Sequence, residues 1–129
     1  MEKNDVVSHW VQGSEADKAA AEGLYKLGHY NWSLFIWHLV IEKVLKAKIV
    51  SINKEISITH DLTRLAKEAE LDINQERMDE FKEITGFNLE ARYDDYKLSF
   101  YKKADKTYTD EWISKCENLF KWIKNQITL

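Results

Sequence analysis

Ionisable side chains gather in three short segments of the chain that are otherwise apolar and helical in pattern. These segments are residues 38–47 (HLVIEKVLKA), 59–62 (THDL) and 91–94 (ARYD). A charged group within an apolar helix is costly unless it is paired, and such groups concentrate at functional sites. The three segments are therefore where we expect the chemistry of this protein.

The first segment places His38 and Glu42 four residues apart, on one face of a predicted helix, where they can hydrogen-bond to each other. Lys46 lies four residues beyond Glu42 and favours a Glu-to-Lys pair, with Lys43 next to that carboxylate. In one interpretation these contacts only satisfy the charges of a packed helix. In the other, Glu42, Lys43 and Lys46 border a cleft and bind a phosphate or a carboxylate of a partner.

The second segment combines helix capping with an imidazole. Thr59 or Asp61 can accept backbone N–H groups at the start of a helix, and an acid there suits the helix dipole. His60 is not needed for capping, so it either has a structural role or projects towards a cleft. The spacing of His38 and Glu42 also suits helical metal ligands, but no second such pair appears, so we predict no metal site.

The third segment ends a predicted helix with an arginine, which is followed by Tyr-Asp-Asp-Tyr at residues 93–96. The guanidinium of Arg92 offers a rigid fork of N–H donors for a phosphate or a carboxylate. The structural alternative is a salt bridge from Arg92 to Asp95 or to Glu42. The sequence leaves both interpretations open.

Helices must position these segments, because the chain has no proline, only four glycines and no long pattern of period two. Gly28 is a predicted helix stop, since glycine readily takes the left-handed conformation. We expect helices over residues 5–27 and 31–50, and further helices that begin near Thr59, after Asn74 and near Thr109. The predicted fold is all-α, an up-and-down bundle of four or five helices that forms one domain over residues 1–129.

Composition narrows the classes of function. The net charge of −3 does not imply a general affinity for nucleic acid, although residues 97–129 hold seven lysines and only four acids. The single Cys116 cannot form an internal disulfide, and residues 1–5 lack the pattern of a signal peptide. The longest nearly uncharged stretch, residues 30–41, is too short to cross a bilayer. We therefore expect a cytoplasmic protein with no membrane role and no cofactor.

The order and spacing of the motifs resemble the HEPN domain, a family of small helical bundles from prokaryotes and some eukaryotes. The likeness runs from Trp10 through nearly the whole chain. It is carried by Gly-His-Tyr at residues 28–30, Glu-Lys-Val-Leu-Lys-Ala at 42–47, Thr-His-Asp-Leu at 59–62 and Ala-Arg-Tyr-Asp at 91–94. The resemblance implies a helical bundle that is often a homodimer. It also implies a small nucleotidyltransferase as partner, in a pair that resembles a toxin–antitoxin system.

Some HEPN proteins are metal-independent ribonucleases that use an arginine followed, four to six residues later, by a histidine. Imidazole moves a proton near neutral pH, and guanidinium stabilises the charged transition state. No histidine follows Arg92 in this chain. The sequence instead resembles the non-nuclease branch, whose motif is normally Ala-Arg-Tyr-Pro-Asp. Here Asp94 stands in place of the proline, which leaves the turn after Arg92 open.

The leading hypothesis is thus a non-catalytic, dimeric HEPN module that binds a nucleotide or a nucleotidyltransferase. Its candidate binding residues are Arg92, Glu42, Lys43, Lys46, His60 and Asp61. A second hypothesis is a ribonuclease toxin with an altered site, in which folding brings Arg92 close to His60 or His38. A third is that a partner transfers a nucleotidyl group onto a tyrosine. The candidate acceptors are Tyr93, Tyr96 and Tyr101.

Overall fold

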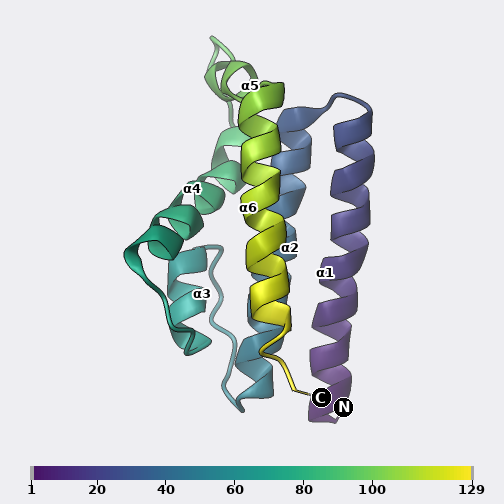
Figure 1. Cartoon of the computed structure of the whole chain (residues 1–129), viewed down its shortest axis with the longest axis vertical. Coiled ribbons are helices and arrows are strands. Elements are labelled where there is room, and N and C mark those ends of the chain that lie inside the picture. The colour runs from purple at the N-terminus through teal and green to yellow at the C-terminus, as the bar shows by residue number, and fades with distance from the viewer. Residues whose placement is uncertain (1, 129) are drawn as a thin grey trace.

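The computed structural model describes residues 2–128 and shows a bundle of six α-helices over that part of the chain (Figure 1). Their bounds are α1 Lys3–Lys26, α2 Tyr30–Ser51, α3 Leu62–Glu68, α4 Gln75–Arg92, α5 Ser99–Lys103 and α6 Lys106–Lys124. No strand occurs among residues 2–128. The predicted all-α class is confirmed, with six helices in place of the four or five expected.

The first two helices form a long antiparallel hairpin that turns at Gly28. This glycine has a φ of +81°, and the backbone N–H groups of Gly28 and His29 donate to the carbonyls of Tyr25 and Leu24. Such bonds satisfy the last carbonyls of a helix and end it, as the sequence indicates. Gly13 does not interrupt α1. A Cβ placed there would lie 3.4 Å from Cδ of Lys43, so this glycine leaves room for the side chain of Lys43.

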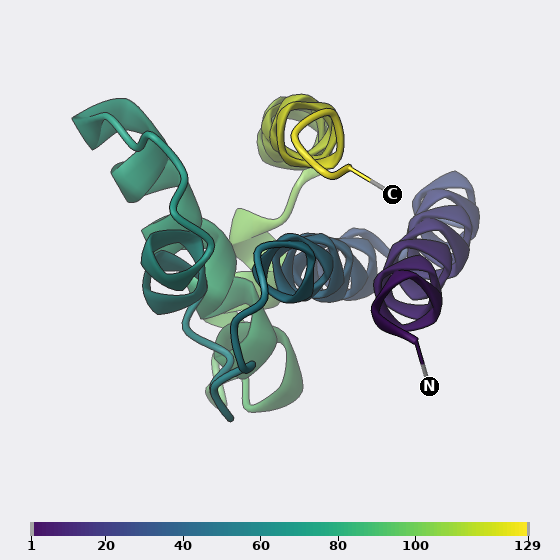
Figure 2. The same cartoon turned by 90° about the horizontal axis from the view of Figure 1, so that it is seen from below.

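Helix α2 is the centre of the bundle. In Figure 2, α1 lies on one side of it, α3 and α4 lie on the opposite side, and α6 packs across a third side. Trp37, Ile41 and Leu45 of α2 are fully buried. The first half of α2 is apolar on nearly every side, and such a helix belongs in the interior because each of its faces must be covered by another element. Polar groups on α2 are therefore surrounded by neighbours on several sides.

Three elements begin or occur where the sequence did not predict them. Helix α3 begins at Leu62 and not near Thr59, because the carboxylate of Asp61 caps it by accepting from the backbone N–H of Thr63 at 3.0 Å. Helix α6 begins at Lys106, capped by Asp105, a turn before the predicted start. Helix α5 was not predicted at all. In residues 2–128 no helix is both long enough and apolar enough to cross a membrane.

Candidate functional site

The three charged segments meet on one side of α2 in a continuous chain of hydrogen bonds. His38 Nε2 lies 3.0 Å from the backbone carbonyl oxygen of His60, in the loop between α2 and α3. The ring of His60 turns back to α2, where its Nδ1 lies 2.6 Å from Oε1 of Glu42. Lys46 Nζ donates to the other oxygen, Oε2, of Glu42 at 3.2 Å. The loop before α3 is thereby attached to α2 at two points.

His38 is fully buried, and its hydrogen bonds define its tautomer. A carbonyl oxygen only accepts, so the hydrogen of the neutral ring is on Nε2 and points to the carbonyl of His60. Its Nδ1 is then an acceptor, and the side-chain amide of Asn88 donates to it at 3.2 Å. Burial lowers the pKa of His38 below its ordinary value of 6.5. This imidazole is therefore neutral at physiological pH.

The side-chain amide of Asn88 extends this series of hydrogen bonds to Arg92, one turn later on α4. Because its NH₂ group faces His38, its Oδ1 is directed to Arg92, whose Nη2 donates to it. Arg92 Nε also donates to the backbone carbonyl of Asn88 at 3.1 Å. The guanidinium carbon lies 5.8 Å from the ring centroid of Phe35 and 5.1 Å from that of Tyr93. Arg92 is nevertheless exposed to solvent.

These contacts correct two predictions. His38 does not hydrogen-bond to Glu42, because its ring reaches the α3 loop and α4 instead, which leaves Glu42 to His60. Arg92 forms no salt bridge with Asp95 or Glu42, and none of the ion pairs among residues 2–128 includes it. The predicted pair of Glu42 and Lys46 is confirmed.

Two of the remaining candidate binding residues, Lys43 and Asp61, lie outside this chain of hydrogen bonds. Lys43 forms an ion pair with Asp17 of α1, at 2.7 Å between Nζ and Oδ2, and so joins the first two helices. Asp61 caps α3. Lys46 lies over the ring of Trp10, 5.1 Å from its centroid, which adds a cation–π contact to its bond with Glu42. Lys43 and Asp61 thus have structural partners.

The turn after Arg92 is built by carboxylates. One oxygen of Asp94 accepts from the backbone N–H of Phe100 at 3.0 Å, and the other accepts from that of Tyr101 at 2.9 Å. Asp95 accepts from the backbone and hydroxyl of Ser99, and these bonds lower the pKa of its carboxyl group. The two aspartates therefore start α5 without the proline of the family motif.

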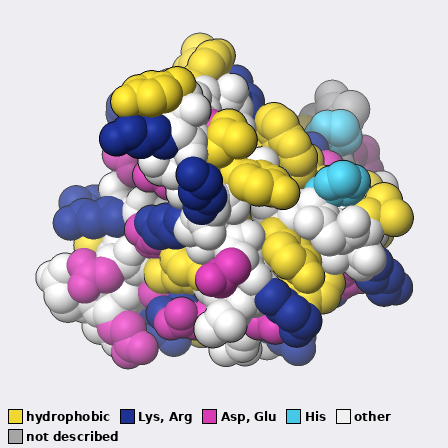
Figure 3. Space-filling view, turned by 90° about the horizontal axis from the view of Figure 1, so that it is seen from above, with side chains coloured by type: hydrophobic (Ala, Val, Ile, Leu, Met, Phe, Trp, Pro, Cys, Tyr) yellow, Lys and Arg dark blue, Asp and Glu magenta, His cyan; other side chains and the backbone are white. Residues whose placement is uncertain are grey.

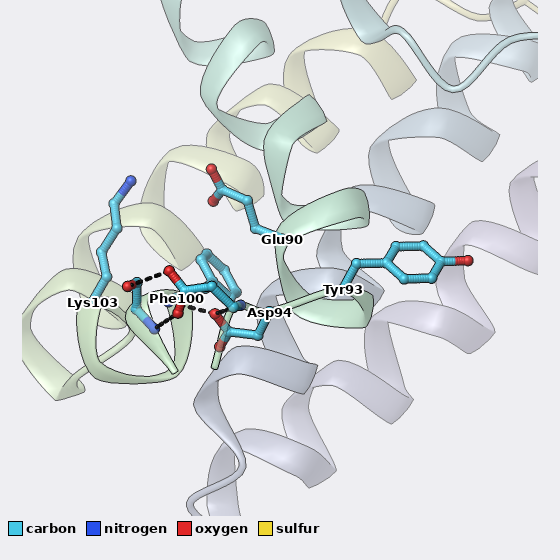
Figure 4. A pocket seen from close by; sticks show the side chains of 7 residues that line it. Glu90, Tyr93, Asp94, Phe100 and Lys103 are labelled. Carbon is cyan, nitrogen blue, oxygen red and sulfur yellow. Dashed lines mark hydrogen bonds between the residues drawn. The ribbon is translucent and has the colours of Figure 1, made fainter. Parts of the chain in front are cut away.

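A cavity of about 270 Å³ lies beside this turn (Figure 4). Its lining consists of Glu90, Tyr93, Asp94, Asp95, Ser99, Phe100 and Lys103. In Figure 4 the ring of Tyr93 points away from Phe100 and Lys103. Burial raises the pKa of Glu90 above its ordinary value. The cavity is mixed in charge, and its carboxylates at 94 and 95 are already engaged by backbone N–H groups.

The three candidate tyrosines are exposed at this end of the bundle. Tyr96 is 90% exposed, and Tyr93 and Tyr101 are also largely open to solvent. Figure 3 looks onto the end that carries α5 and the α1–α2 turn, and hydrophobic side chains form a group there with cationic side chains beside it. Further exposed apolar residues of these elements are Leu27, Trp32 and Leu98.

Sequence reasoning missed the role of Asn88. Asn88 lies on the stripe of α4 that includes Phe81 and Ile84, and like them it is buried. The available signal was its spacing, because an amide at the end of an apolar stripe lies four residues before Arg92 and shares its helix face. A buried amide needs partners, and Arg92 is the ionisable residue one turn away on the same face of α4.

The fold and the site together define a small helical-bundle protein in which a series of hydrogen-bonded polar side chains connects the second and fourth helices. The HEPN domain family matches residues 7–126, and the chain belongs to this family. No curated protein and no solved structure matches it. Within residues 2–128 no group of three His, Cys, Asp or Glu side chains is placed to hold a metal ion.

Proposed function

We propose that this HEPN domain is a non-catalytic binding module that holds a phosphate group of a nucleotide at Arg92. It is the HEPN half of a two-component system with a nucleotidyltransferase, and it acts as a homodimer. The observation that carries the proposal is the state of Arg92, which is anchored on one edge by Asn88 and exposed on the other.

The chemistry of a guanidinium supports a phosphate ligand. Arginine has five N–H hydrogens, and Asn88 takes two of them, so three remain for an incoming oxyanion. Holding the side chain in advance lowers the entropy that binding must overcome. The neighbouring rings of Phe35 and Tyr93 offer flat surfaces on which a base can stack. Anchored charge beside aromatic surface suits a nucleotide better than a free carboxylate.

The positions of the histidines support a role without catalysis. His38 is sealed in the core, and both of its ring nitrogens are engaged, so it cannot exchange protons with a substrate. No histidine follows Arg92 in the sequence. General acid–base catalysis needs a group within hydrogen-bond reach of the reacting proton.

One observation favours the ribonuclease as a second candidate function. The side chain of His60 is 65% exposed, and the carboxylate of Glu42 holds its Nδ1. A carboxylate that orients an imidazole in this way leaves Nε2 available for proton transfer. In this alternative Arg92 stabilises the transition state and His60 moves the proton.

The exposed tyrosines favour a third role, as acceptors of a nucleotidyl group. The phenol oxygen of Tyr93, Tyr96 or Tyr101 attacks the α-phosphate of a nucleoside triphosphate held by the partner enzyme, loses its proton and displaces pyrophosphate. The apolar group at the same end of the bundle supports docking of a partner, because exposed hydrophobic patches of this kind are typical of interaction sites.

The decisive experiment is a calorimetric titration of the purified chain with AMP and, in parallel, with adenosine. We expect AMP to bind, adenosine to bind far more weakly, and Arg92→Gln to remove the difference. Arg64→Gln is the matched control, because Arg64 is also exposed but lies on α3 in a pair with Glu68. Equal affinity of the wild-type protein for AMP and adenosine would exclude a phosphate site at Arg92.

Two further measurements address the alternatives and the assembly. Co-expression with a nucleotidyltransferase encoded beside this protein, followed by intact-mass measurement, tests the acceptor role, which predicts a mass increase of one nucleotidyl group. Light scattering on the purified chain tests the homodimer. A monomer at all concentrations would contradict that part of the proposal.

A further inference from the structure

From Arg92 to the loop between α2 and α3, each side chain donates a hydrogen bond to the next residue in the series. The carbonyl of His60 requires a donor, so His38 presents Nε2–H to it and has only an acceptor left on Nδ1. That acceptor requires the NH₂ group of Asn88, which leaves the amide oxygen for Arg92. The orientation of a buried amide on α4 is therefore determined by a backbone carbonyl of a loop.

We propose that Asn88 is a positioning residue for Arg92 and that a proton on His38 releases the arginine by reversing the Asn88 amide. This inference rests on the proposed function only for its consequence, which is regulation of anion binding at Arg92. The device itself consists of groups whose contacts are given above.

Protonation of His38 is incompatible with the observed orientation of the Asn88 amide. Imidazolium carries a hydrogen on both nitrogens, so the new Nδ1–H of His38 faces the NH₂ group of Asn88 across 3.2 Å. Both groups are buried, and water is not at hand to separate two donors. Rotation of the amide by about 180° gives its oxygen to His38. The NH₂ group then faces Nη2 of Arg92, donor against donor.

Reversal removes one of the two anchors of the arginine. The bond from Nη2 to Asn88 Oδ1 is lost, and only the bond from Nε to the Asn88 carbonyl remains. Arg92 is at the end of α4 with its outer edge in solvent, so with this anchor lost its side chain is held less tightly and samples more rotamers. An oxyanion ligand has to order it again, at a cost in affinity.

The surroundings of His38 determine the pH range in which it becomes protonated. Burial opposes the imidazolium most strongly, whereas the hydrogen bond to the backbone carbonyl of His60 and the charge of Glu42 on α2 favour it. The charges of the His60 side chain and of Arg92 on α4 oppose it. The pKa of His38 is therefore below the ordinary value of 6.5. Asn88 therefore holds Arg92 at physiological pH and releases it only when the pH falls below neutral.

The first test needs no ligand. The chain is labelled with ¹⁵N, and the histidine ring and arginine side-chain resonances are followed by NMR as the pH is lowered. We expect His38 to show the Nε2–H tautomer at neutral pH, and its protonation to coincide with faster solvent exchange and averaging of the Arg92 side-chain signals. An Nδ1–H tautomer, or Arg92 signals that do not respond as His38 titrates, would overturn the proposal.

Asn88→Asp separates positioning from a general structural role. A carboxylate cannot donate to His38 Nδ1 but still accepts from Arg92. In this variant His38 is expected to be imidazolium already at neutral pH, with Arg92 held across the whole range. Asn118→Asp makes the same change at an exposed position of α6 and should leave both responses as in the wild type. Neutral His38 in Asn88→Asp would contradict the mechanism.

The consequence for binding is tested with the dinucleoside monophosphate ApA, whose phosphodiester keeps one negative charge over this pH range. The wild-type affinity is expected to fall roughly three- to tenfold as His38 is protonated, the loss of about one hydrogen bond. Asn88→Asp should lack this pH response. Absence of ApA binding at every pH counts against the proposed function alone, because the NMR titration decides the device independently.

Discussion

Nδ1 of His60 lies 2.6 Å from Oε1 of Glu42, a carboxylate whose side chain is only 6% exposed in the middle of α2. The same carboxylate accepts from Lys46, so both of its oxygens are engaged. A buried carboxylate is stable only with such partners. Glu42 thus belongs to the packing of the bundle as well as to the candidate site.

Replacement of Glu42 by alanine is therefore expected to destabilise the fold. It leaves His60 and the largely buried ammonium of Lys46 without their acceptor, and we expect a loss of about 1–3 kcal/mol in the free energy of unfolding. Urea denaturation at neutral pH measures it. Glu55→Ala, at an exposed position of the α2–α3 loop, is the control and should change stability little. A Glu42→Ala protein as stable as this control would contradict the structural role.

The buried His38 makes stability depend on pH. Its pKa is lower in the folded chain than the ordinary 6.5, so below that value the unfolded chain binds more protons than the folded one. The free energy of unfolding should therefore fall as the pH drops through this range and be insensitive to His38 above it. His38→Gln should flatten the profile, a difference that urea midpoints from pH 5 to 8 will measure. Parallel profiles for the two proteins would argue against a neutral buried imidazole.

Asp94 is expected to hold α5 in place. Asp94→Ala removes the acceptor for two backbone N–H groups, a change comparable to the loss of a helix cap, and should cost about 0.5–2 kcal/mol. Hydrogen exchange should accelerate at the amides of Phe100 and Tyr101. Asp72→Ala, in the exposed turn before α4, offers a matched comparison. Unchanged protection of the two amides would show that α5 stands without the carboxylate.

The wild-type protein is expected to cleave no RNA. The assay compares purified wild type with Arg92→Ala on single-stranded and structured RNA, and equal background in both supports the binding role. Cleavage that disappears in both Arg92→Ala and His60→Ala would instead establish the ribonuclease, with His60 as the group that moves the proton.

Helical spacing predicted the pairing of Glu42 with Lys46, and the sequence pattern predicted helices close to the observed α1, α2 and α4. It did not predict which partner each group prefers. His38 and Glu42 share a helix face, yet each forms its bond with a residue from another element, because His60 and Asn88 offer better directed groups. Such contacts join residues 18 and 50 positions apart, beyond what a local pattern can indicate.

The short α5 was missed for a related reason. Its start depends on the carboxylate of Asp94, which accepts from N–H groups six and seven residues ahead. Ordinary capping patterns place the acceptor within three residues of the helix start, and the residue that precedes α5, Leu98, has a left-handed φ of 55°. Neither property follows from the propensities of the residues involved.

The contact between Glu42 and His60 also has a meaning in terms of chain entropy. It joins residues 18 positions apart and so closes the segment that leaves α2 and enters α3 into a loop without a covalent cross-link. Closing a flexible loop of this length costs on the order of 2–3 kcal/mol, since the cost grows with the logarithm of length. Once this loop is closed, the residues that follow His60 are separated from α2 by a shorter effective length of chain. Formation of the contact should therefore favour the docking of α3 and α4 during folding.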